Sequence, residues 1–392
     1  MLIGLAQVNS YVGDIDKNVS LIIDYIELGR SKFKLDTIIF PELVLSGYPP
    51  EDLLYRPAFH KRINDALNTI SKKTIDINLI FGYPRLEGNT IYNSCVVMSN
   101  GKSVGSYDKM ALPNYGVFDE KRYFDHGTTS CLVDLNGIKA GLSICEDIWS
   151  PEPLILAMEA GAELIININA SPFHKNKTDE RRLVLQDRIK ETGIPIIYVN
   201  QIGGQDELVF DGGSMIMDEN GKVIFQAPQF EENLYVAEIN KKGHLLEISA
   251  PKHTVEKLSH EEIIYKALVL AVRDYVNKNG FKGVVIGLSG GIDSALVACI
   301  ACDALGNENV EVIMMPSRFT SEMSIDDSKQ LSNTLNISHR VISIDNIFSS
   351  FVELLKPVFN NLPEDATEEN IQARCRGIIL MAVSNKSHKL VL

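Results

Sequence analysis

The sequence has few of the features that mark membrane or secreted proteins. None of its apolar runs approaches the roughly 20 residues that a membrane-spanning helix needs. The amino terminus, MLIGLAQVNS, lacks the basic and apolar regions of a signal peptide. Six cysteines in a chain of 392 residues do not make a disulfide framework. We therefore expect a cytoplasmic protein in a reducing compartment, with no membrane partner.

Basic residues are also scarce. The chain carries 38 Lys and Arg against 51 Asp and Glu, which gives a formal net charge of -13. This balance disfavours nonspecific binding to nucleic acid, and we expect no nucleic-acid partner. With 45% hydrophobic and 23% charged residues, the composition is that of a globular protein, and the length suits two domains.

Short β-rich runs alternate with helical patterns over about the first 240 residues. The expected strands are residues 2–8, 37–40, 78–83, 95–98, 138–145, 162–169 and 195–200. Helical patterns cover residues 18–32 and 56–73, and Asn-Gly at 220–221 predicts a hairpin over 214–225. This alternation indicates an α/β layered fold.

A polar, charged stretch with weak periodicity follows near residue 240. We therefore predict an N-terminal domain over 1–245, a linker over 246–262 and a second domain over 263–392. The second domain is predicted to begin with an amphipathic helix (261–280), followed by a strand (283–289) and a loop that leads into a second helix (290–306). Two further strands are expected within 310–316 and 339–345.

Three polar residues lie at the ends of expected strands or just beyond them. They are Glu42 in IIFPE, Lys109 in YDKMALPNYG and Cys145 in SICED. In open α/β sheets, sites gather beyond the carboxyl ends of strands. A cysteine nucleophile needs a proton acceptor and a group that stabilises the oxyanion, and Glu42 and Lys109 could supply them. Taken singly, each residue also fits an ordinary role, since a cysteine at a strand end is usually a small core residue.

Four segments together carry a resemblance to a known superfamily. They are FPELVLSGYPPEDLL (40–54), YDKMALPNYGVFDEKRYF (107–124), CEDIW (145–149) and NASPF (169–173). In this order they resemble the carbon–nitrogen hydrolases, or nitrilases, over residues 1 to about 240. The resemblance implies an αββα sandwich with a Glu-Lys-Cys triad at Glu42, Lys109 and Cys145. It also implies a supporting role for Glu120, which could otherwise form a surface ion pair with Lys121 or Arg122.

The variants of these motifs are similar to the glutaminase domain of the glutamine-dependent NAD synthetase family. In that family, the substrate's α-amino and α-carboxylate groups are held by residues that match Tyr115, Glu146, Ser171 and Lys177. A carboxylate suits the ammonium group, and a cation with a hydroxyl suits the carboxylate.

The segment IGLSGGIDSALVACI (286–300) predicts a phosphate-binding loop between a strand and a helix. Glycines allow close approach of a phosphate, and the helix start offers N–H groups and a positive dipole end. A carboxylate there suggests a bridging Mg²⁺, with Asp293 as its ligand. The loop is not a Walker A motif, because GK[ST] is missing. SGGIDSA resembles the loop of the ATP pyrophosphatases, which implies ATP binding by Ser289, Gly290, Gly291, Ile292, Asp293 and Ser294.

Two downstream segments, 315–328 and 368–386, also resemble NAD synthetases. They imply that Arg318 lies near ATP and Arg374 near ATP or deamido-NAD, although Arg374 could simply lie on an exposed helix face. Cys299 and Cys302 lie on one expected helix without further ligands, so we predict no metal site there.

The fold prediction is thus an N-terminal αββα nitrilase-like sandwich followed by a partial Rossmann-like ATP-pyrophosphatase domain. The resemblance implies glutamine hydrolysis coupled to ATP-dependent amidation of deamido-NAD, with ATP and Mg²⁺, in a homo-oligomer. The family continues into segments beyond HKLVL, so we expect the synthetase half to be incomplete. Alternatives are a stand-alone amidase with a non-functional second domain, a noncatalytic scaffold, and another ATP-pyrophosphatase amidotransferase.

Overall fold

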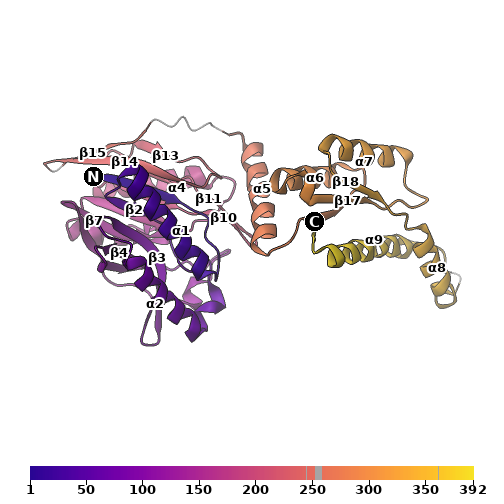
Figure 1. Cartoon of the computed structure of the whole chain (residues 1–392), viewed down its shortest axis with the longest axis horizontal. Helices are drawn as coiled ribbons and strands as arrows, with labels where there is room; N and C mark the ends of the chain where they lie inside the picture. The colour runs from indigo at the N-terminus through magenta and orange to yellow at the C-terminus, as the bar shows by residue number, and fades with distance from the viewer. Residues whose placement is uncertain (244, 252–257, 361) are drawn as a thin grey trace. The chain divides into compact units, whose positions relative to one another are not determined.

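The computed structural model describes residues 1–243, 245–251, 258–360 and 362–392. The chain divides into two compact units, Met1–Ala267 and Leu268–Leu392, which are coloured from indigo to orange and from orange to yellow (Figure 1). Each unit is described by itself below.

Two β-sheets form the centre of the first unit. One has seven strands in the order β15-β14-β1-β2-β3-β4-β5, and the other has six in the order β13-β12-β9-β8-β7-β6. The first sheet consists of β1 (Leu2–Gln7), β2 (Thr37–Ile39), β3 (Asn78–Glu87), β4 (Thr90–Ser99), β5 (Lys102–Asp108), β14 (Asn233–Lys242) and β15 (Leu245–Ser249). The second consists of β6 (Leu132–Leu135), β7 (Ile138–Ile144), β8 (Leu164–Asn169), β9 (Ile196–Asn200), β12 (Met215–Met217) and β13 (Val223–Gln226). A separate hairpin joins β10 (Ile202–Gln205) to β11 (Leu208–Asp211).

The central strands are apolar on both faces because both faces are covered. Along β8, Ile166 and Ile168 pack in the core between the two sheets, whereas Ile165 packs against the helices on the outside. Ile3 and Ile39 of the first sheet belong to the same inter-sheet core. Since side chains alternate along a strand, a continuous apolar run is what a strand between two buried layers requires.

Helices cover the outer face of each sheet. Helices α1 (Ile15–Leu28) and α2 (Pro57–Ser71) pack on the first sheet, and α3 (Glu152–Glu159) and α4 (Lys177–Thr192) pack on the second. The layers therefore run helix, sheet, sheet, helix. This confirms the predicted αββα sandwich.

Two local predictions can be compared with the structure. The hairpin over 214–225 forms β12 and β13, with Gly221 at φ +75° at the end of the turn. Residues 246–249 of the predicted linker, which lie in a polar and weakly periodic stretch, instead belong to edge strand β15 paired with β14. An edge strand has one solvated face, so Leu246 is buried and its neighbour Glu247 is exposed. Polar residues on the exposed face make such a strand difficult to recognise in the sequence. Residues 252–257 of the predicted linker lie outside the described residues.

The second unit is built on a four-stranded parallel sheet in the order β18-β17-β16-β19. Its strands are β16 (Val284–Gly287), β17 (Val310–Met314), β18 (Ser338–Val341) and β19 (Leu390–Val391). Residues of α5 (His260–Lys278), α6 (Ile292–Leu305) and α7 (Glu322–Leu335) pack in the core on one face. Helix α9 (Ala366–Ser387) packs on the other face, and α8 (Asp345–Phe359) contacts α9. Parallel strands with helices on both faces make this unit Rossmann-like.

Among the described residues, no helix is both long enough and apolar enough to cross a membrane.

Candidate active site

The three candidate catalytic residues each follow the last residues of a strand in the sandwich. Glu42 comes after β2, Lys109 directly after β5 and Cys145 directly after β7. All three are buried, with exposed fractions of 0%, 1% and 3%. Close backbone packing helps to place Glu42, because a Cβ at Gly82 would lie 2.7 Å from Glu42 Cα. The fold thus brings together, in one buried site, side chains that lie far apart in the sequence.

Lys109 is the centre of this cluster. Its Nζ donates to Glu42 Oε1 at 2.7 Å and to both oxygens of Glu120, at 2.8 and 2.9 Å. Tyr48 donates its hydroxyl to Glu120 at 2.8 Å. Glu120 is 5% exposed and its carboxylate turns inward to Lys109, which excludes the alternative of a surface ion pair with Lys121 or Arg122. A buried carboxylate needs such a partner, since an unpaired buried charge is costly.

Glu42 is held on both of its oxygens. Asn93 Nδ2 donates to Oε1 at 2.7 Å, and the backbone N–H of Ala170 donates to Oε2 at 2.8 Å. The Ala170 bond comes from the NASPF segment, so that segment orients the carboxylate directly. A general base fixed in this way does not have to be reoriented before it accepts a proton.

Cys145 lies at the junction between β7 and a short 3₁₀ helix, Cys145–Trp149. Its backbone φ is +44°, a left-handed conformation that non-glycine residues rarely adopt. Such strain is concentrated at functional sites, where the surrounding structure holds it in place. The turn resembles the strained strand-to-helix turns that present nucleophiles in hydrolases.

The electrostatics of the cluster keep the thiol protonated at rest. Burial raises the pKa of Cys145 well above its usual range, Glu42 adds to the rise, and Lys109 opposes it. Burial would lower the pKa of Lys109, but Glu120 and Glu42 outweigh it and raise that pKa well above its usual range. Burial raises the pKa of Glu120 to about 7, although Lys109 favours its charged form. Cys145 must therefore lose its proton as it attacks.

Asp147, in the CEDIW segment, also belongs to this site, although the sequence motifs assign it no separate role. It is fully buried and accepts from Ile144 N at 2.9 Å and Tyr107 Oη at 2.8 Å on one oxygen. Its other oxygen accepts from Met110 N at 3.0 Å and Ala111 N at 2.7 Å. Asp147 thus ties the strand that carries Cys145 to the segment that carries Lys109. Its pKa is raised to about 6 by burial.

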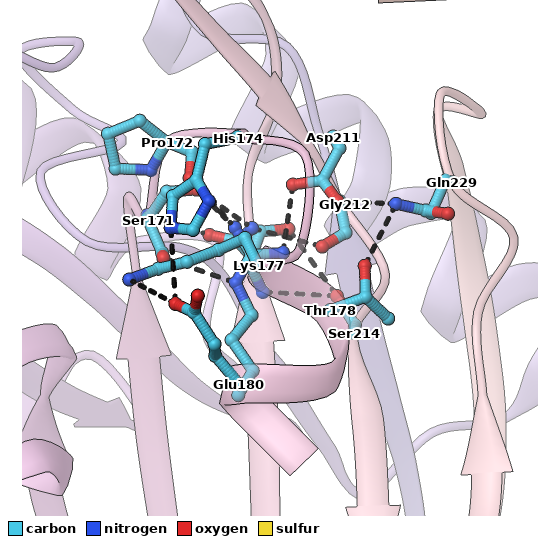
Figure 2. Close-up of polar contacts among 12 residues, drawn as sticks. Ser171, Pro172, His174, Lys177, Thr178, Glu180, Asp211, Gly212, Ser214 and Gln229 are labelled. Atoms are coloured by element: carbon cyan, nitrogen blue, oxygen red, sulfur yellow. Dashed lines mark hydrogen bonds and ion pairs between the residues drawn. The ribbon is translucent and has the colours of Figure 1, made fainter. Parts of the chain in front are cut away.

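The four candidate glutamine-binding residues form two groups, Tyr115 with Glu146 and Lys177 with Ser171. Tyr115 donates its hydroxyl to Glu146 at 2.9 Å, and burial, Glu146 and the nearby Cys145 all raise the pKa of Tyr115. The Lys177 ammonium lies 4.0 Å from the centre of the Trp149 ring, and its pKa is lowered by burial and by the charge of Arg181. Ser171 belongs to the network of Figure 2, which also contains Lys177, Thr178, Asp211 and Gln229.

Ser171 is 3% exposed, and its backbone and hydroxyl are both engaged. Its N–H donates to Asn200 Oδ1 at 2.9 Å, and its hydroxyl accepts from Arg181 Nε at 3.2 Å. His174 lies at the rim of the same network, where it contacts Glu180 at 3.1 Å. Ser171 is therefore a rigid part of the wall rather than a free surface hydroxyl.

The predicted phosphate loop of the second unit lies between β16 and α6, at the carboxyl end of β16. Neighbouring strands β17 and β19 lie on opposite sides of β16, so the loop is at a topological switch point. The hydroxyls of Ser289 and Ser294 lie 3.0 Å apart, and the Ser294 hydroxyl also donates to Gly291 O at 3.0 Å. These bonds join the loop to the first turn of helix α6, whose first N–H groups have no partner within the helix.

The loop borders a hollow of about 430 Å³ that Asp327, Ser328 and residues of α6 and α7 also line. Asp293 is exposed at the start of α6. Over the described ranges, no three His, Cys, Asp or Glu side chains gather into a group able to hold a metal ion. A single carboxylate still fits Mg²⁺ bound mainly through substrate phosphates, which is its usual mode.

The two candidate arginines of the second unit differ in their surroundings. Arg318 donates its Nη2 to Ser349 Oγ at 2.7 Å, and its Nε lies 3.4 Å from Asp345. Arg374 is exposed and donates to Asn370 O of its own helix at 3.0 Å. Among the described residues, neither arginine forms a hydrogen bond or ion pair with the phosphate loop. Their proposed contacts with nucleotide remain predictions.

Replacing Gly290 by alanine should damage the phosphate loop selectively. Gly290 has φ +82°, and a Cβ there would lie 2.4 Å from Ser324 O of the facing helix α7. The change should therefore displace the loop and weaken ATP binding by at least roughly tenfold, measured by calorimetry. Gly116, also at positive φ but with open space around it, provides the matched control. Unchanged ATP binding by Gly290→Ala would contradict the assignment of this loop.

Two family models match the chain. Residues 2–243 match the carbon-nitrogen hydrolase model, and residues 264–392 match the NAD synthase model. The glutamine-dependent NAD(+) synthetase of Acinetobacter baylyi is 42% identical over 391 residues, which are 100% of this chain and 71% of the relative.

Solved structures agree with these matches. The glutamine-dependent NAD+ synthetase of Acinetobacter baumannii, in complex with ADP, aligns with 100% of this chain and 73% of its own at a TM-score of 0.95 and 42% identity. An amidase from Nesterenkonia sp. aligns with 60% of this chain and 89% of its own at a TM-score of 0.55 and 26% identity.

Proposed function

The chain belongs to the glutamine-dependent NAD(+) synthetase family, and we propose that it couples glutamine hydrolysis to the amidation of deamido-NAD. We assign the hydrolysis to residues 1–245 and the amidation to residues 263–392. The observation that carries the first assignment is the buried contact of Lys109 with Glu42 and Glu120 beside the strained Cys145.

At the first site, the Cys145 thiol attacks the side-chain amide carbonyl of glutamine while Glu42 takes the thiol proton. Lys109 Nζ and the N–H of Glu146 stabilise the negative oxygen of the tetrahedral intermediate. Glu42 then gives its proton to the leaving nitrogen, which departs as ammonia and leaves a γ-glutamyl thioester. Water, deprotonated by Glu42, cleaves the thioester to glutamate and restores the thiol.

Glu146 and Tyr115 hold the α-ammonium group of glutamine, and Lys177 and Ser171 hold its α-carboxylate. Glu146 already accepts from Tyr115 at 2.9 Å, so it presents a fixed negative charge to the ligand. The Lys177 ammonium lies 4.0 Å from the centre of the Trp149 ring, and the side chain is half-buried, so its positive charge is held in a defined position. Opposite charges at the two ends of the pocket favour an amino acid over a simple amide.

At the second site, Ser289, Gly290, Gly291, Ile292, Asp293 and Ser294 bind the phosphates of ATP. The carboxylate of deamido-NAD attacks ATP to form an adenylate and release pyrophosphate. Ammonia then displaces AMP to give NAD. Bound Mg²⁺, with Asp293 as its protein ligand, would neutralise phosphate charge during the first step. Arg318 and Arg374 are proposed to approach ATP and deamido-NAD.

A stand-alone amidase is not favoured, because residues 264–392 match the NAD synthase model and the structural match to a synthetase covers the whole chain. We further propose that the protein is cytoplasmic. We also propose that it acts as a homo-oligomer, and light scattering on the purified chain would test this oligomeric state.

The coupled function is tested by following NAD formation from deamido-NAD, ATP and Mg²⁺ with either glutamine or ammonium chloride as the nitrogen source. We expect both sources to support NAD formation, and glutamine to yield one glutamate for each NAD. Ammonium-driven synthesis depends only on the second site, so it serves as the control. Glutamate release without NAD from either source would contradict the proposed amidation by this chain.

A further inference from the structure

A buried ion pair lies behind the glutamine pocket. Arg181 of α4 is 2% exposed, and its Nη1 donates to Asp211 Oδ1 at 2.8 Å. Asp211, at the end of β11, is fully buried. Burying a guanidinium and a carboxylate costs much of what their attraction returns, so the pair by itself is weak evidence for a stabilising role. The other contacts of Arg181 indicate what the pair does.

The other hydrogen bonds that Arg181 donates all go to one segment, Ser171 and Pro172. Its Nε donates to Ser171 Oγ at 3.2 Å, and its Nη2 donates to Ser171 O at 2.7 Å and Pro172 O at 3.2 Å. The planar guanidinium thus holds one side chain and two carbonyls in fixed directions. Because Nε donates to Ser171 Oγ, the hydroxyl proton of Ser171 is directed away from Arg181.

Asp211 is in turn held from its other side. Gln229 Nε2 donates to Asp211 Oδ2 at 2.7 Å and to Thr178 Oγ1 at 3.0 Å. Figure 2 shows Asp211, Gln229 and Thr178 joined in this way, with Ser171 and Lys177 nearby. The network therefore joins the start of α4, which carries Lys177, to the segment that carries Ser171.

The same segment reaches the catalytic base. Ala170, the residue before Ser171, donates its N–H to Glu42 at 2.8 Å. Asn200 also holds this segment, because it accepts from Ser171 N at 2.9 Å and its Nδ2 donates to Ser171 O at 3.3 Å. Asn200 thus bonds only the backbone of Ser171, whereas Arg181 also bonds the Ser171 hydroxyl and the Pro172 carbonyl.

We propose that Arg181, oriented by Asp211, is a positioning residue that sets Ser171 and Pro172 for glutamine binding. The inference rests on the proposed glutaminase function. It assigns to Arg181 an effect on substrate affinity rather than on the reactivity of Cys145, because Arg181 donates to Ser171 and Pro172 and to no group of the catalytic cluster.

The test compares Arg181→Lys with Arg182→Lys in the full chain. Lysine keeps the positive charge and reaches one partner, but it cannot donate to Asp211, Ser171 and Pro172 at once as the planar guanidinium does. We expect Arg181→Lys to raise KM for glutamine roughly tenfold or more, with kcat for glutamate release within a few-fold of wild type. The rate of Cys145 alkylation by iodoacetamide, which does not need the glutamine pocket, should stay within about twofold. Arg182 is partly exposed and bonds to Gln226, so its variant should match wild type in every readout.

Two results would overturn the proposal. One is an unchanged KM in Arg181→Lys. The other is a fall in alkylation rate and thermal midpoint that parallels the loss of affinity, which would indicate a purely structural role. If Arg181→Lys does not fold, Gln229→Met removes the hydrogen bonds to Asp211 and Thr178 while keeping Arg181, and it should raise KM about threefold. Wild-type chain without glutaminase activity would instead refute the proposed function itself.

Discussion

Replacing Cys145 by alanine is expected to remove glutamate release to the level of the enzyme-free blank. The variant loses the only atom that forms a covalent bond to the substrate, and removal of a catalytic nucleophile costs about six orders of magnitude in kcat in a serine protease. The residue lies in a strained turn with φ +44°, and alanine, which also carries a Cβ, tolerates this conformation no worse than cysteine does. The fold should therefore survive, and ammonium-driven NAD formation should persist.

The matched control is Cys131→Ala, which removes a half-buried cysteine outside the cluster. It should release glutamate at the wild-type rate. Glutamate release by Cys145→Ala at more than a small fraction of the wild-type rate would contradict nucleophilic catalysis at this residue.

Replacing Lys109 by methionine is expected to abolish glutaminase activity and also to destabilise the first unit. The change leaves two buried carboxylates, Glu42 and Glu120, without the cation that lies 2.7 and 2.8 Å from them. Breaking a buried ion pair by removing one partner typically costs about 3–5 kcal/mol. The thiolate of Cys145 also loses its stabilising charge, since Lys109 lowers the pKa of that thiol. Thermal unfolding and glutamate release check the two effects separately.

The loss of stability in Lys109→Met should depend on pH with a definite sign. Burial raises the pKa of Glu120 from 4.5 to about 7, and Lys109 opposes that rise, so its removal raises the pKa further. A carboxyl with a raised pKa in the folded state binds protons more tightly there, so its contribution to stability is lost as pH rises through that pKa. The deficit relative to wild type should therefore be larger near about pH 8 than near about pH 5.5. A deficit that grows on acidification would contradict the buried cluster.

The candidate catalytic residues could be named from the sequence because each lies in a short, contiguous motif that resembles the carbon–nitrogen hydrolases. Glu42 and Cys145 also follow apolar runs that predict buried strands, whereas Lys109 follows β5, which is mostly exposed and was not expected. The alternation of strand and helix patterns indicates only an α/β layered fold, and the two-sheet sandwich is implied by the resemblance to the carbon–nitrogen hydrolases. The sequence does not show that Glu120 points inward, because its neighbours Lys121 and Arg122 offer equally plausible surface partners.

The supporting residues could not be found in this way, since their roles arise from long-range pairing. Asp147 gains its role from Tyr107 and Met110, which lie 40 and 37 residues away in the sequence. Arg181 and Asp211 are 30 residues apart, in a helix and a strand whose packing no local pattern specifies. Strand β15 was missed because an exposed edge strand can be as polar as a linker.

The central claim is that Cys145 is the nucleophile of a glutamine-specific pocket. The most direct measurement treats the full chain with a diazoketone analogue of glutamine and locates the label by peptide mass spectrometry. The account predicts one label for each chain, on the peptide that contains Cys145, and protection by added glutamine. A label on another residue, or labelling of Cys145 that glutamine does not slow, would contradict it.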